Sequence, residues 1–238
     1  MAFVRTLLTF VLASAVAASA CSTRDERTRQ GQHAAAAEQE PAHTGDGKPR
    51  IVILGDSLTA GLGLPIEQSY PSLLQQRLDE SGLDYQVVNA GVSGDTSAGG
   101  VSRLDWALEG DVRVLVVALG GNDGLRGLPV EQLKHNLSEI IERAQARGIA
   151  VILAGMEAPP NYGRDYIVAF HKVYPALSSQ YHVPLVPFLL QGVAGSAALN
   201  QPDGIHPTAA GARRVADNVW AALKPVAEAQ QSKTAGGS

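Results

Sequence analysis

Short aliphatic runs alternate five times with segments of helical periodicity between residues 50 and 225. Strands that are aliphatic on both sides are typical of a parallel sheet covered by helices on both faces. The sequence therefore predicts an α/β fold with three layers (α/β/α), in which the crossovers between strands are right-handed. The runs that we expect to form strands are residues 51–54, 85–88, 112–119, 149–153 and 183–188.

Helical periodicity fills the intervals between these runs. The clearest case, residues 131–147, carries an apolar stripe from Leu133 to Ala144, which predicts an amphipathic helix. Pro184 and Pro187 in the fifth run predict a strand at the edge of the sheet, because proline cannot donate to the ladder. The expected helices are residues 71–83, 101–108, 131–147, 166–181 and 208–223.

Composition excludes several classes of function. The chain has 238 residues, of which 45% are hydrophobic, enough for a full core. The net charge of -4 and the lack of a recurring basic stretch argue against nucleic acid as a partner. Cys21 is the only cysteine, so an internal disulfide and a cysteine-based metal site are both excluded. His135 and His182 have no partners at ligand spacing, so we expect no metal site. We also expect a monomer without a cofactor.

The first 20 residues have the three regions of a secretory signal peptide. Arg5 is followed by an apolar run over residues 7–18, which ends in Ala18-Ser19-Ala20. This run is shorter than the roughly 20 residues that a membrane-spanning helix needs. We therefore expect an exported protein.

Two interpretations of the cleavage site remain open. Ala-x-Ala before Cys21 fits an ordinary signal peptidase. The same residues resemble a bacterial lipobox, which would make Cys21 a lipidated first residue and anchor the protein to a membrane, although a larger aliphatic residue usually stands where Ala18 is. The expected location is thus the periplasm or, as a lipoprotein, a membrane surface.

Composition also divides the chain into segments. Residues 21–49 are polar and alanine-rich without an apolar period, which predicts a flexible tether. Residues 50–225 form the expected domain, and the polar residues 226–238 are expected to be a disordered tail.

Polar residues follow the expected strands where each one ends. Ser57 follows the first run, Gly94 the second, Asn122 the third, and Asp203 and His206 the fifth. In a doubly wound sheet the carboxyl ends of the strands share one edge, which is where such folds place their sites. The sequence therefore predicts that these five residues lie close together.

These residue types suit acyl transfer. A nucleophilic serine needs a base, and the base needs an orienting carboxylate. We expect His206 to take the proton of Ser57 and Asp203 to hold the imidazole. The oxyanion of a tetrahedral intermediate needs donors, which the Gly94 N–H, the Asn122 amide and the Ser57 N–H can supply.

Each residue alone also fits a structural role. Ser57 could be a helix N-cap, since serine is preferred there. Asp203 lies in Pro-Asp-Gly, a strong turn signal, and His206 could cap the last helix. Asn122 could shape a turn. Only the joint placement of the five residues favours the catalytic interpretation.

Four motifs in this order resemble the SGNH hydrolases, also called GDSL esterases and lipases. The resemblance covers about residues 50 to 225 and rests on Gly55-Asp-Ser-Leu58, Gly94, Gly121-Asn-Asp123 and Asp203-Gly-Ile-His206. Further stretches at 120–127 and 160–164 are similar to the branch that contains bacterial periplasmic thioesterases, arylesterases and lysophospholipases. The tether at 21–49 departs from the compact members of that branch.

The resemblance implies a five-stranded parallel sheet in flavodoxin-like order. It also implies Ser57 as nucleophile, Asp203 and His206 as its triad partners, and Gly94 and Asn122 as oxyanion donors. It further implies a carboxylic ester hydrolase that acts on small-molecule fatty-acyl esters and thioesters through an acyl-enzyme. Two alternatives are a carbohydrate O-acetyl esterase, as in other branches, and a doubly wound binding module without catalysis.

Two apolar loops are expected to flank the acyl chain. The first, residues 120–128, contains Gly124 and Gly127, and we interpret it as a mobile lid. The second covers residues 156–162. The residues expected to bind substrate are Leu125, Leu128, Met156, Pro159 and Tyr162.

Overall fold

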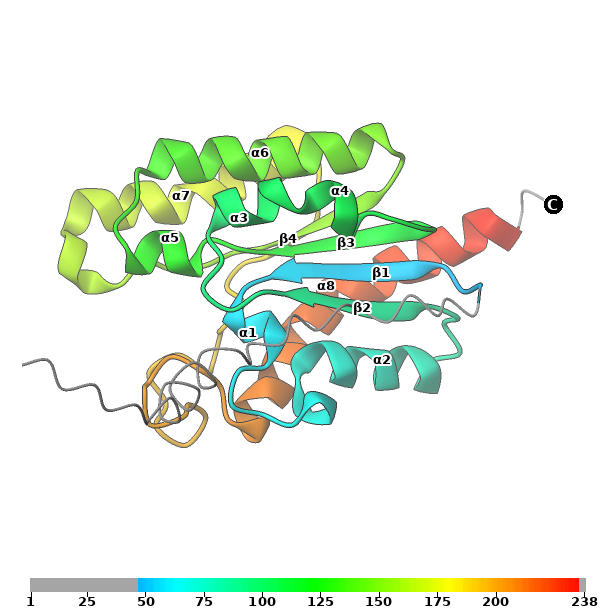
Figure 1. Ribbon diagram of the computed structural model, residues 1–238, viewed down its shortest axis with the longest axis horizontal. Helices are drawn as coiled ribbons and strands as arrows, with labels where there is room; N and C mark the ends of the chain where they lie inside the picture. The colour runs from blue at the N-terminus through cyan, green and yellow to red at the C-terminus, as the bar shows by residue number, and fades with distance from the viewer. Residues whose placement is uncertain (1–46, 236–238) are drawn as a thin grey trace, which may run out of the picture. The chain divides into compact units, whose positions relative to one another are not determined.

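The computed structural model describes residues 47–235. Five parallel strands form one sheet in the order β2-β1-β3-β4-β5 (Figure 1), so the predicted α/β fold and its flavodoxin-like strand order are confirmed. The signal peptide expected at 1–20, Cys21 and nearly all of the tether lie outside the described residues. The strands are β1 (Arg50–Gly55), β2 (Gln86–Gly91), β3 (Val112–Ala118), β4 (Ala150–Ala154) and β5 (Leu185–Val186).

Helices cover both faces of this sheet. In Figure 1, α3, α4, α6 and α7 lie on one side, and α1, α2 and α8 lie on the other. The helices are α1 (Ser57–Ala60), α2 (Tyr70–Glu80), α3 (Ser97–Ser102), α4 (Leu104–Ala107), α5 (Gly121–Leu125), α6 (Val130–Ala146), α7 (Arg164–Tyr181) and α8 (Ala209–Ala235), with short 3-10 helices η1 (Ile66–Gln68) and η2 (Pro160–Tyr162).

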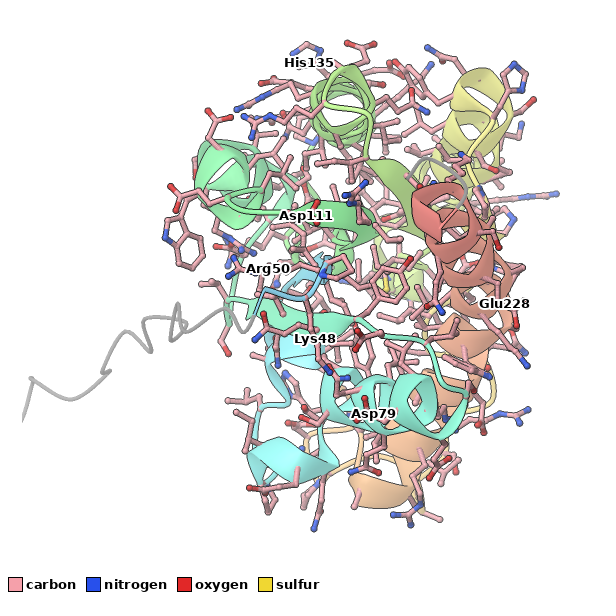
Figure 2. The ribbon with its side chains drawn as sticks, turned by 90° about the vertical axis from the view of Figure 1, so that its right-hand side faces the viewer. Lys48, Arg50, Asp79, Asp111, His135 and Glu228 are labelled. Atoms are coloured by element: carbon pink, nitrogen blue, oxygen red, sulfur yellow. The ribbon has the colours of Figure 1, made fainter. Side chains whose placement is uncertain are left out.

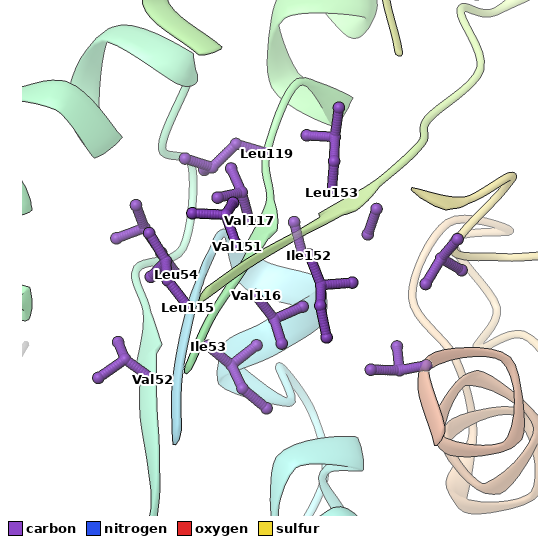
Figure 3. Close-up of a cluster of buried hydrophobic side chains, with 14 of the residues drawn as sticks. Val52, Ile53, Leu54, Leu115, Val116, Val117, Leu119, Val151, Ile152 and Leu153 are labelled. Atoms are coloured by element: carbon purple, nitrogen blue, oxygen red, sulfur yellow. The ribbon is translucent and has the colours of Figure 1, made fainter. Parts of the chain in front are cut away.

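The aliphatic runs of β1, β3 and β4 form the centre of the core. Figure 3 shows their side chains packed in two layers, one against each set of helices. Val52 and Ile53 on β1 and Val116 on β3 are at most 1% exposed. Burying one such side chain stabilises the fold by about 1.5–3 kcal/mol. The central strands are therefore a rigid base for the loops that follow them.

The order of the strands determines where a crevice forms. β1 pairs with β2 on one side and with β3 on the other. The connections that leave the carboxyl ends of β1 and β3 therefore run to opposite faces of the sheet, which is the arrangement that creates a ligand crevice in open α/β folds. Ser57 follows β1 and Asn122 follows β3, so both lie at this switch point.

Three expectations about secondary structure are corrected. The helix expected at 101–108 is two short helices, α3 and α4, which meet at Arg103. The loop expected at 120–128 contains helix α5. There Gly124 is needed for close packing, because a Cβ on it would lie 3.2 Å from the Phe170 ring. Gly124 therefore does not support the interpretation of residues 120–128 as a mobile lid, which was based on Gly124 and Gly127.

The third correction concerns the end of the chain. The helix expected to stop at Leu223 runs to Ala235, so the disordered tail expected at 226–238 is helical over its described part. Tertiary contacts explain this, since the buried Ala227 accepts a hydrogen bond of 3.0 Å from the hydroxyl of Tyr85. Residues 236–238 lie outside the described part of the chain.

Candidate active site

Ser57 is the first residue of helix α1, directly beyond the end of β1. Asp56 is the N-cap of this helix, and its Oδ1 accepts a hydrogen bond of 3.0 Å from the Leu58 N–H. The alternative interpretation of Ser57 as the cap is therefore wrong. Because Asp56 caps the helix, the Ser57 hydroxyl is available for other partners.

The side chains of Ser57, His206 and Asp203 form a continuous relay. The Nε2 atom of His206 lies 2.9 Å from Oγ of Ser57, and its Nδ1 lies 2.7 Å from Oδ2 of Asp203. One ring nitrogen thus faces the hydroxyl and the other faces the carboxylate. This is the geometry that a serine, a general base and an orienting carboxylate require.

The backbone of the same turn holds the Asp203 carboxylate. Its Oδ1 accepts hydrogen bonds from the backbone N–H groups of His206, at 3.0 Å, and Ile205, at 2.8 Å. These two bonds, followed by that to the His206 ring, lower the pKa of Asp203 to about 2. Asp203 is therefore an anion throughout the neutral and mildly acidic range, as a partner for an imidazolium must be. Asp203 therefore has both of the roles that the sequence suggests, because it shapes the turn and also holds the imidazole of His206.

Asn122 lies in the first turn of α5 with its amide directed toward the crevice between β1 and β3. Its Nδ2 donates to the Asp95 carbonyl at 2.8 Å and to Oδ2 of Asp56 at 3.3 Å. Both acceptors neighbour other predicted site residues, since Asp56 precedes Ser57 and Asp95 follows Gly94. The structure thus brings the Asn122 amide to the loops that carry the other candidate oxyanion donors.

The backbone conformation at position 94 explains why this residue is a glycine. Its φ angle of 84° lies in the left-handed region, which L-residues with side chains disfavour. Space is not the constraint, because an added Cβ would meet only the Arg126 side chain, at 3.8 Å. Arg126 also donates to the Gly94 carbonyl at 2.8 Å and so connects this loop to the end of α5.

Asp56 is a buried carboxyl group beside the triad, with only 3% of its surface exposed. Burial is the main cause that raises its pKa, to about 6, while the hydrogen bond from the Leu58 N–H and the nearby His206 act in the opposite direction. Its charge therefore develops in the pH range in which the site is expected to work.

Arg103 connects the carboxyl ends of β1 and β2 with the loop that carries Gly94. Its Nε donates to Oδ2 of Asp95 at 2.6 Å, its Nη1 to the Ala90 carbonyl at 2.8 Å, and its Nη2 to the Gly55 carbonyl at 2.8 Å. Its side chain is only 16% exposed. One guanidinium thus fixes the turn before Ser57 and the loop that carries Gly94. The sequence prediction missed Arg103 and Asp95, because both contacts depend on the tertiary fold.

A second buried network supports α5. Asp123 accepts from the Ser97 N–H at 2.8 Å and from its hydroxyl at 2.6 Å. The amide of Asn136 on α6 donates to the same hydroxyl at 2.9 Å. Because Asp123 follows Asn122, this network fixes the helical turn that carries the amide.

A small apolar cavity adjoins Ser57 and His206. None of the five residues expected to bind substrate contributes to its lining, so their role remains a prediction. Met156 lies beside the start of α5, since its Cε would lie 3.1 Å from a Cβ on Gly121. Tyr162 donates to the Leu125 carbonyl at 2.8 Å. The other residues that line the cavity are Leu58, Gly61, Leu62, Leu64, Tyr70, Pro207, Ala212 and Val215.

A larger apolar groove lies between β5 and α8 and contains no residue of the triad, so its size does not mark the reaction site. Among residues 47–235, no group of three or more His, Cys, Asp or Glu side chains is arranged to hold a metal ion. No helix in that same range has the length and apolar character needed to cross a bilayer.

Known proteins share both the sequence and the fold. The profile of the GDSL-like lipase/acylhydrolase family matches residues 53–214. The chain is 49% identical to esterase TesA of Pseudomonas aeruginosa over 177 residues, which are 74% of this chain and 88% of that protein. It is 38% identical to thioesterase 1/protease 1/lysophospholipase L1 of Escherichia coli, again over 177 residues, which are 74% and 84% of the two chains.

A solved structure agrees with these matches. The crystal structure of the psychrotrophic esterase EstA from Pseudoalteromonas sp., inhibited by monoethylphosphonate, superposes with a TM-score of 0.71 at 34% identity. The superposition covers 75% of this chain and 98% of that one. The likeness therefore extends over nearly the whole of the solved protein.

Proposed function

The chain belongs to the GDSL-like lipase/acylhydrolase family, and on this basis we propose how its residues carry out ester hydrolysis and which substrates it takes. It is a carboxylic ester hydrolase of the SGNH serine esterase and thioesterase type, as its resemblance to named esterases, arylesterases and thioesterases indicates. The observation that carries the mechanism is the relay in which His206 joins Ser57 to Asp203.

In the first half of the reaction, Oγ of Ser57 attacks the acyl carbonyl while Nε2 of His206 takes the hydroxyl proton. Asp203 stabilises the resulting imidazolium. The negative charge on the carbonyl oxygen is stabilised by the Asn122 amide and by the N–H groups of Gly94 and Ser57. His206 then gives its proton to the departing alcohol or thiol, which leaves an acyl group on Ser57.

In the second half, water replaces the leaving group. His206 takes a proton from the water as it attacks the acyl carbonyl, and the same donors stabilise the second oxyanion. Collapse of this intermediate releases the carboxylic acid and returns the proton to Ser57. The step needs no group beyond the residues of the relay, the oxyanion donors and water.

The substrates are fatty-acyl esters and thioesters. The names of the relatives support this class. The cavity beside Ser57 has a volume of about 10 Å³, which is too small for an acyl chain, so the support from the structure is the exposed apolar side chain of Leu62, whose N–H donates to the Ser57 carbonyl at 3.1 Å. An apolar side chain beside the nucleophile favours an acyl chain over the acetyl group of a carbohydrate ester, because burying each CH₂ contributes about 0.8 kcal/mol.

Hydrolysis of p-nitrophenyl esters from two to sixteen carbons, together with one acyl-CoA, tests this class. We expect a maximum of kcat/KM at medium or long chains and measurable thioester cleavage, both lost in Ser57→Ala. Activity confined to the acetyl ester would instead support a carbohydrate O-acetyl esterase. Equal rates for both proteins would remove Ser57 from the mechanism.

Export is a further part of the proposal, supported by the signal-peptide pattern of residues 1–20 and by the position of Cys21. Fractionation of cells that produce the full chain, with and without Cys21→Ser, tests it. A protein that moves from the membrane to the periplasmic fraction on this substitution is lipidated at Cys21. A periplasmic protein in both cases is cleaved without lipidation, and a cytoplasmic one contradicts export.

A further inference from the structure

Asp56 lies between the nucleophile and one of the oxyanion donors. It directly precedes Ser57 in the chain, and its two carboxylate oxygens have different partners. Oδ1 accepts a hydrogen bond from the Leu58 N–H at 3.0 Å, and Oδ2 accepts one from Nδ2 of Asn122 at 3.3 Å. One side chain thus connects the start of α1 with the start of α5.

Asp56 differs from the charged residues at the opposite edge of the sheet. Figure 2 views that edge and labels Lys48, Arg50 and Asp111 close to the starts of the strands. Asp111 is half-exposed there and pairs with Arg113 at 2.6 Å. Asp56 is buried, and the two groups that donate to its oxygens are uncharged amides. Its charge is therefore neither solvated nor neutralised by a direct ion pair.

Capping of α1 explains only one of the two oxygens. Serine caps a helix about as well as aspartate and carries no charge. A buried carboxylate is costly, because burial disfavours its ionised form. The nearby His206 favours the charge and Asp95 opposes it. The cap therefore does not explain why a carboxylate occupies position 56, whereas the need for a second acceptor, toward Asn122, does.

The start of α5 packs directly against this second acceptor. A Cβ on Gly121 would lie 3.1 Å from Oδ2 of Asp56, so the backbone before Asn122 approaches the carboxylate closely. On the other side of Asn122, the carboxylate of Asp123 is held by the N–H and the hydroxyl of Ser97. The main chain at Asn122 is thus fixed from both sides, and the freedom that remains is rotation of the amide.

Two acceptors determine which end of the Asn122 amide faces Asp56 and Ser57. Nδ2 donates to the Asp95 carbonyl at 2.8 Å and to Asp56 at 3.3 Å. A half-turn of the amide would bring its oxygen, which has no hydrogen to donate, against both acceptors. The bond to Asp56 is longer than the usual range of about 2.7–3.2 Å. The hydrogen that points toward Asp56 is therefore only weakly held.

We propose that Asp56 is a positioning residue for the oxyanion site: its second carboxylate oxygen holds the Asn122 amide with the NH₂ group toward the nucleophile, until the oxyanion forms and accepts the weakly held hydrogen bond in its place. This inference rests on the proposed function, because it assigns a further residue to the same reaction. Asp56 acts through Asn122 and does not touch the reacting atoms.

A double-mutant cycle on the full chain tests whether Asp56 acts through Asn122. Asp56→Ser keeps a cap for α1 but removes the acceptor that faces the amide. Its effect is measured with Asn122 in place and in the Asn122→Ala background, as kcat and KM for p-nitrophenyl butyrate. The matched control is Ser69→Ala, which removes the N-cap of α2 and leaves the Asn122 amide untouched.

With Asn122 in place, Asp56→Ser should lower kcat about 10- to 100-fold at a nearly unchanged KM, because a hydrogen bond to a charged group is lost. In the Asn122→Ala background the same substitution should change kcat by less than about twofold. Ser69→Ala should keep the wild-type kcat. Asp56→Asn provides a second variant of the original size, and we expect the same pattern, because it has one acceptor oxygen for two donors.

A wild-type kcat in Asp56→Ser would overturn the proposal, because a cap at position 56 would then be sufficient. Equal losses of kcat in the two backgrounds would also overturn it, since Asp56 would then act independently of Asn122. A higher KM at constant kcat would do the same. Failure of the wild type to hydrolyse the ester would contradict the proposed function itself, whereas the preceding outcomes leave the esterase standing and remove only Asp56 from the oxyanion site.

Discussion

The Nε2 atom of His206 lies 2.9 Å from Oγ of Ser57, although 149 residues separate the two along the chain. The contact forms because Ser57 begins α1 at the carboxyl end of β1, while His206 lies in the connection that follows β5. The turn around Asp203 then fixes the imidazole from its other side. The chemistry of the site depends on this pairing of the first connection with the last.

Asn122→Ala should lower kcat about 10²–10³-fold, because it removes one oxyanion donor, which contributes about 2.7–4 kcal/mol to the barrier. KM should change little, since the donor acts mainly on the charge that develops during the reaction. Steady-state kinetics on a p-nitrophenyl ester measure both. The matched control is Asn218→Ala on α8, which removes an amide that donates to the Leu189 and Gln191 carbonyls and belongs neither to the relay nor to the oxyanion site. A kcat for Asn122→Ala close to the wild-type value would remove this residue from the oxyanion site.

Arg103→Met should lower both activity and stability, because it leaves the Asp95 carboxylate and the carbonyls of Gly55 and Ala90 without their shared donor. We expect a loss of about 2–4 kcal/mol in the free energy of unfolding. We also expect a lower kcat with a nearly unchanged KM.

The control for Arg103 is Arg147→Met, which breaks a solvent-exposed ion pair with Asp105 and should cost about 1 kcal/mol or less. Urea unfolding and steady-state kinetics of both variants provide the comparison. A full retention of kcat in a destabilised Arg103→Met would show that Arg103 supports the fold without positioning the site.

Asp56 should make the fold less stable as the pH rises. Its pKa is about 6 in the folded state against 3.8 for the ordinary side chain, so the folded protein binds this proton more tightly than the unfolded chain does. The destabilisation is absent below pH 3.8, develops between pH 3.8 and 6, and is complete above pH 6. The shift corresponds to about 3 kcal/mol.

Asp56→Asn removes this titration. The difference in the free energy of unfolding between wild type and Asp56→Asn should therefore change by up to about 3 kcal/mol between pH 4 and pH 7, with the wild type relatively less stable at pH 7. Urea unfolding of both proteins across this range measures the difference. A difference that stays constant with pH would show that Asp56 does not titrate there.

Asp203 should behave in the opposite sense. Its pKa is lowered to about 2, so its ionised form adds stability that is present above pH 3.8 and is lost as the pH falls through 2. Asp203→Asn keeps the size of the side chain but removes the charge that stabilises the imidazolium. We expect kcat to fall by up to about 10⁴-fold while the fold at pH 7 persists. Near-normal kcat in a folded Asp203→Asn would exclude Asp203 as the orienting carboxylate.

Local sequence signals were sufficient for the strands and for the triad. The aliphatic run of β3 can be read without tertiary information because both of its faces are buried. Ser57, Asp203 and His206 could be predicted because each follows a strand, and the carboxyl ends of parallel strands share an edge. Gly94 was found in the same way, although its reason for being glycine is its φ of 84° and not the space around it.

Features that depend on long-range contacts could not be predicted in this way. Arg103 has no sequence neighbour that reveals its three acceptors, and the periodicity of 101–108 conceals the break between α3 and α4 at this residue. The end of α8 has the polar composition of a frayed tail, yet Ala227 is buried and bonded to Tyr85. The small cavity beside Ser57 involves Leu62 and Val215, which lie far apart in the sequence.

The identity of the nucleophile is tested most directly by covalent labelling with a p-nitrophenyl alkylphosphonate, followed by peptide mass spectrometry. The reagent loses p-nitrophenol when an activated hydroxyl attacks phosphorus. We expect one adduct per chain, on the peptide that contains Ser57, with a burst of p-nitrophenol of equal amount. The adduct should be absent in Ser57→Ala and should form far more slowly in His206→Ala. An adduct on another residue, or equal labelling of wild type and Ser57→Ala, would show that Ser57 is not the nucleophile.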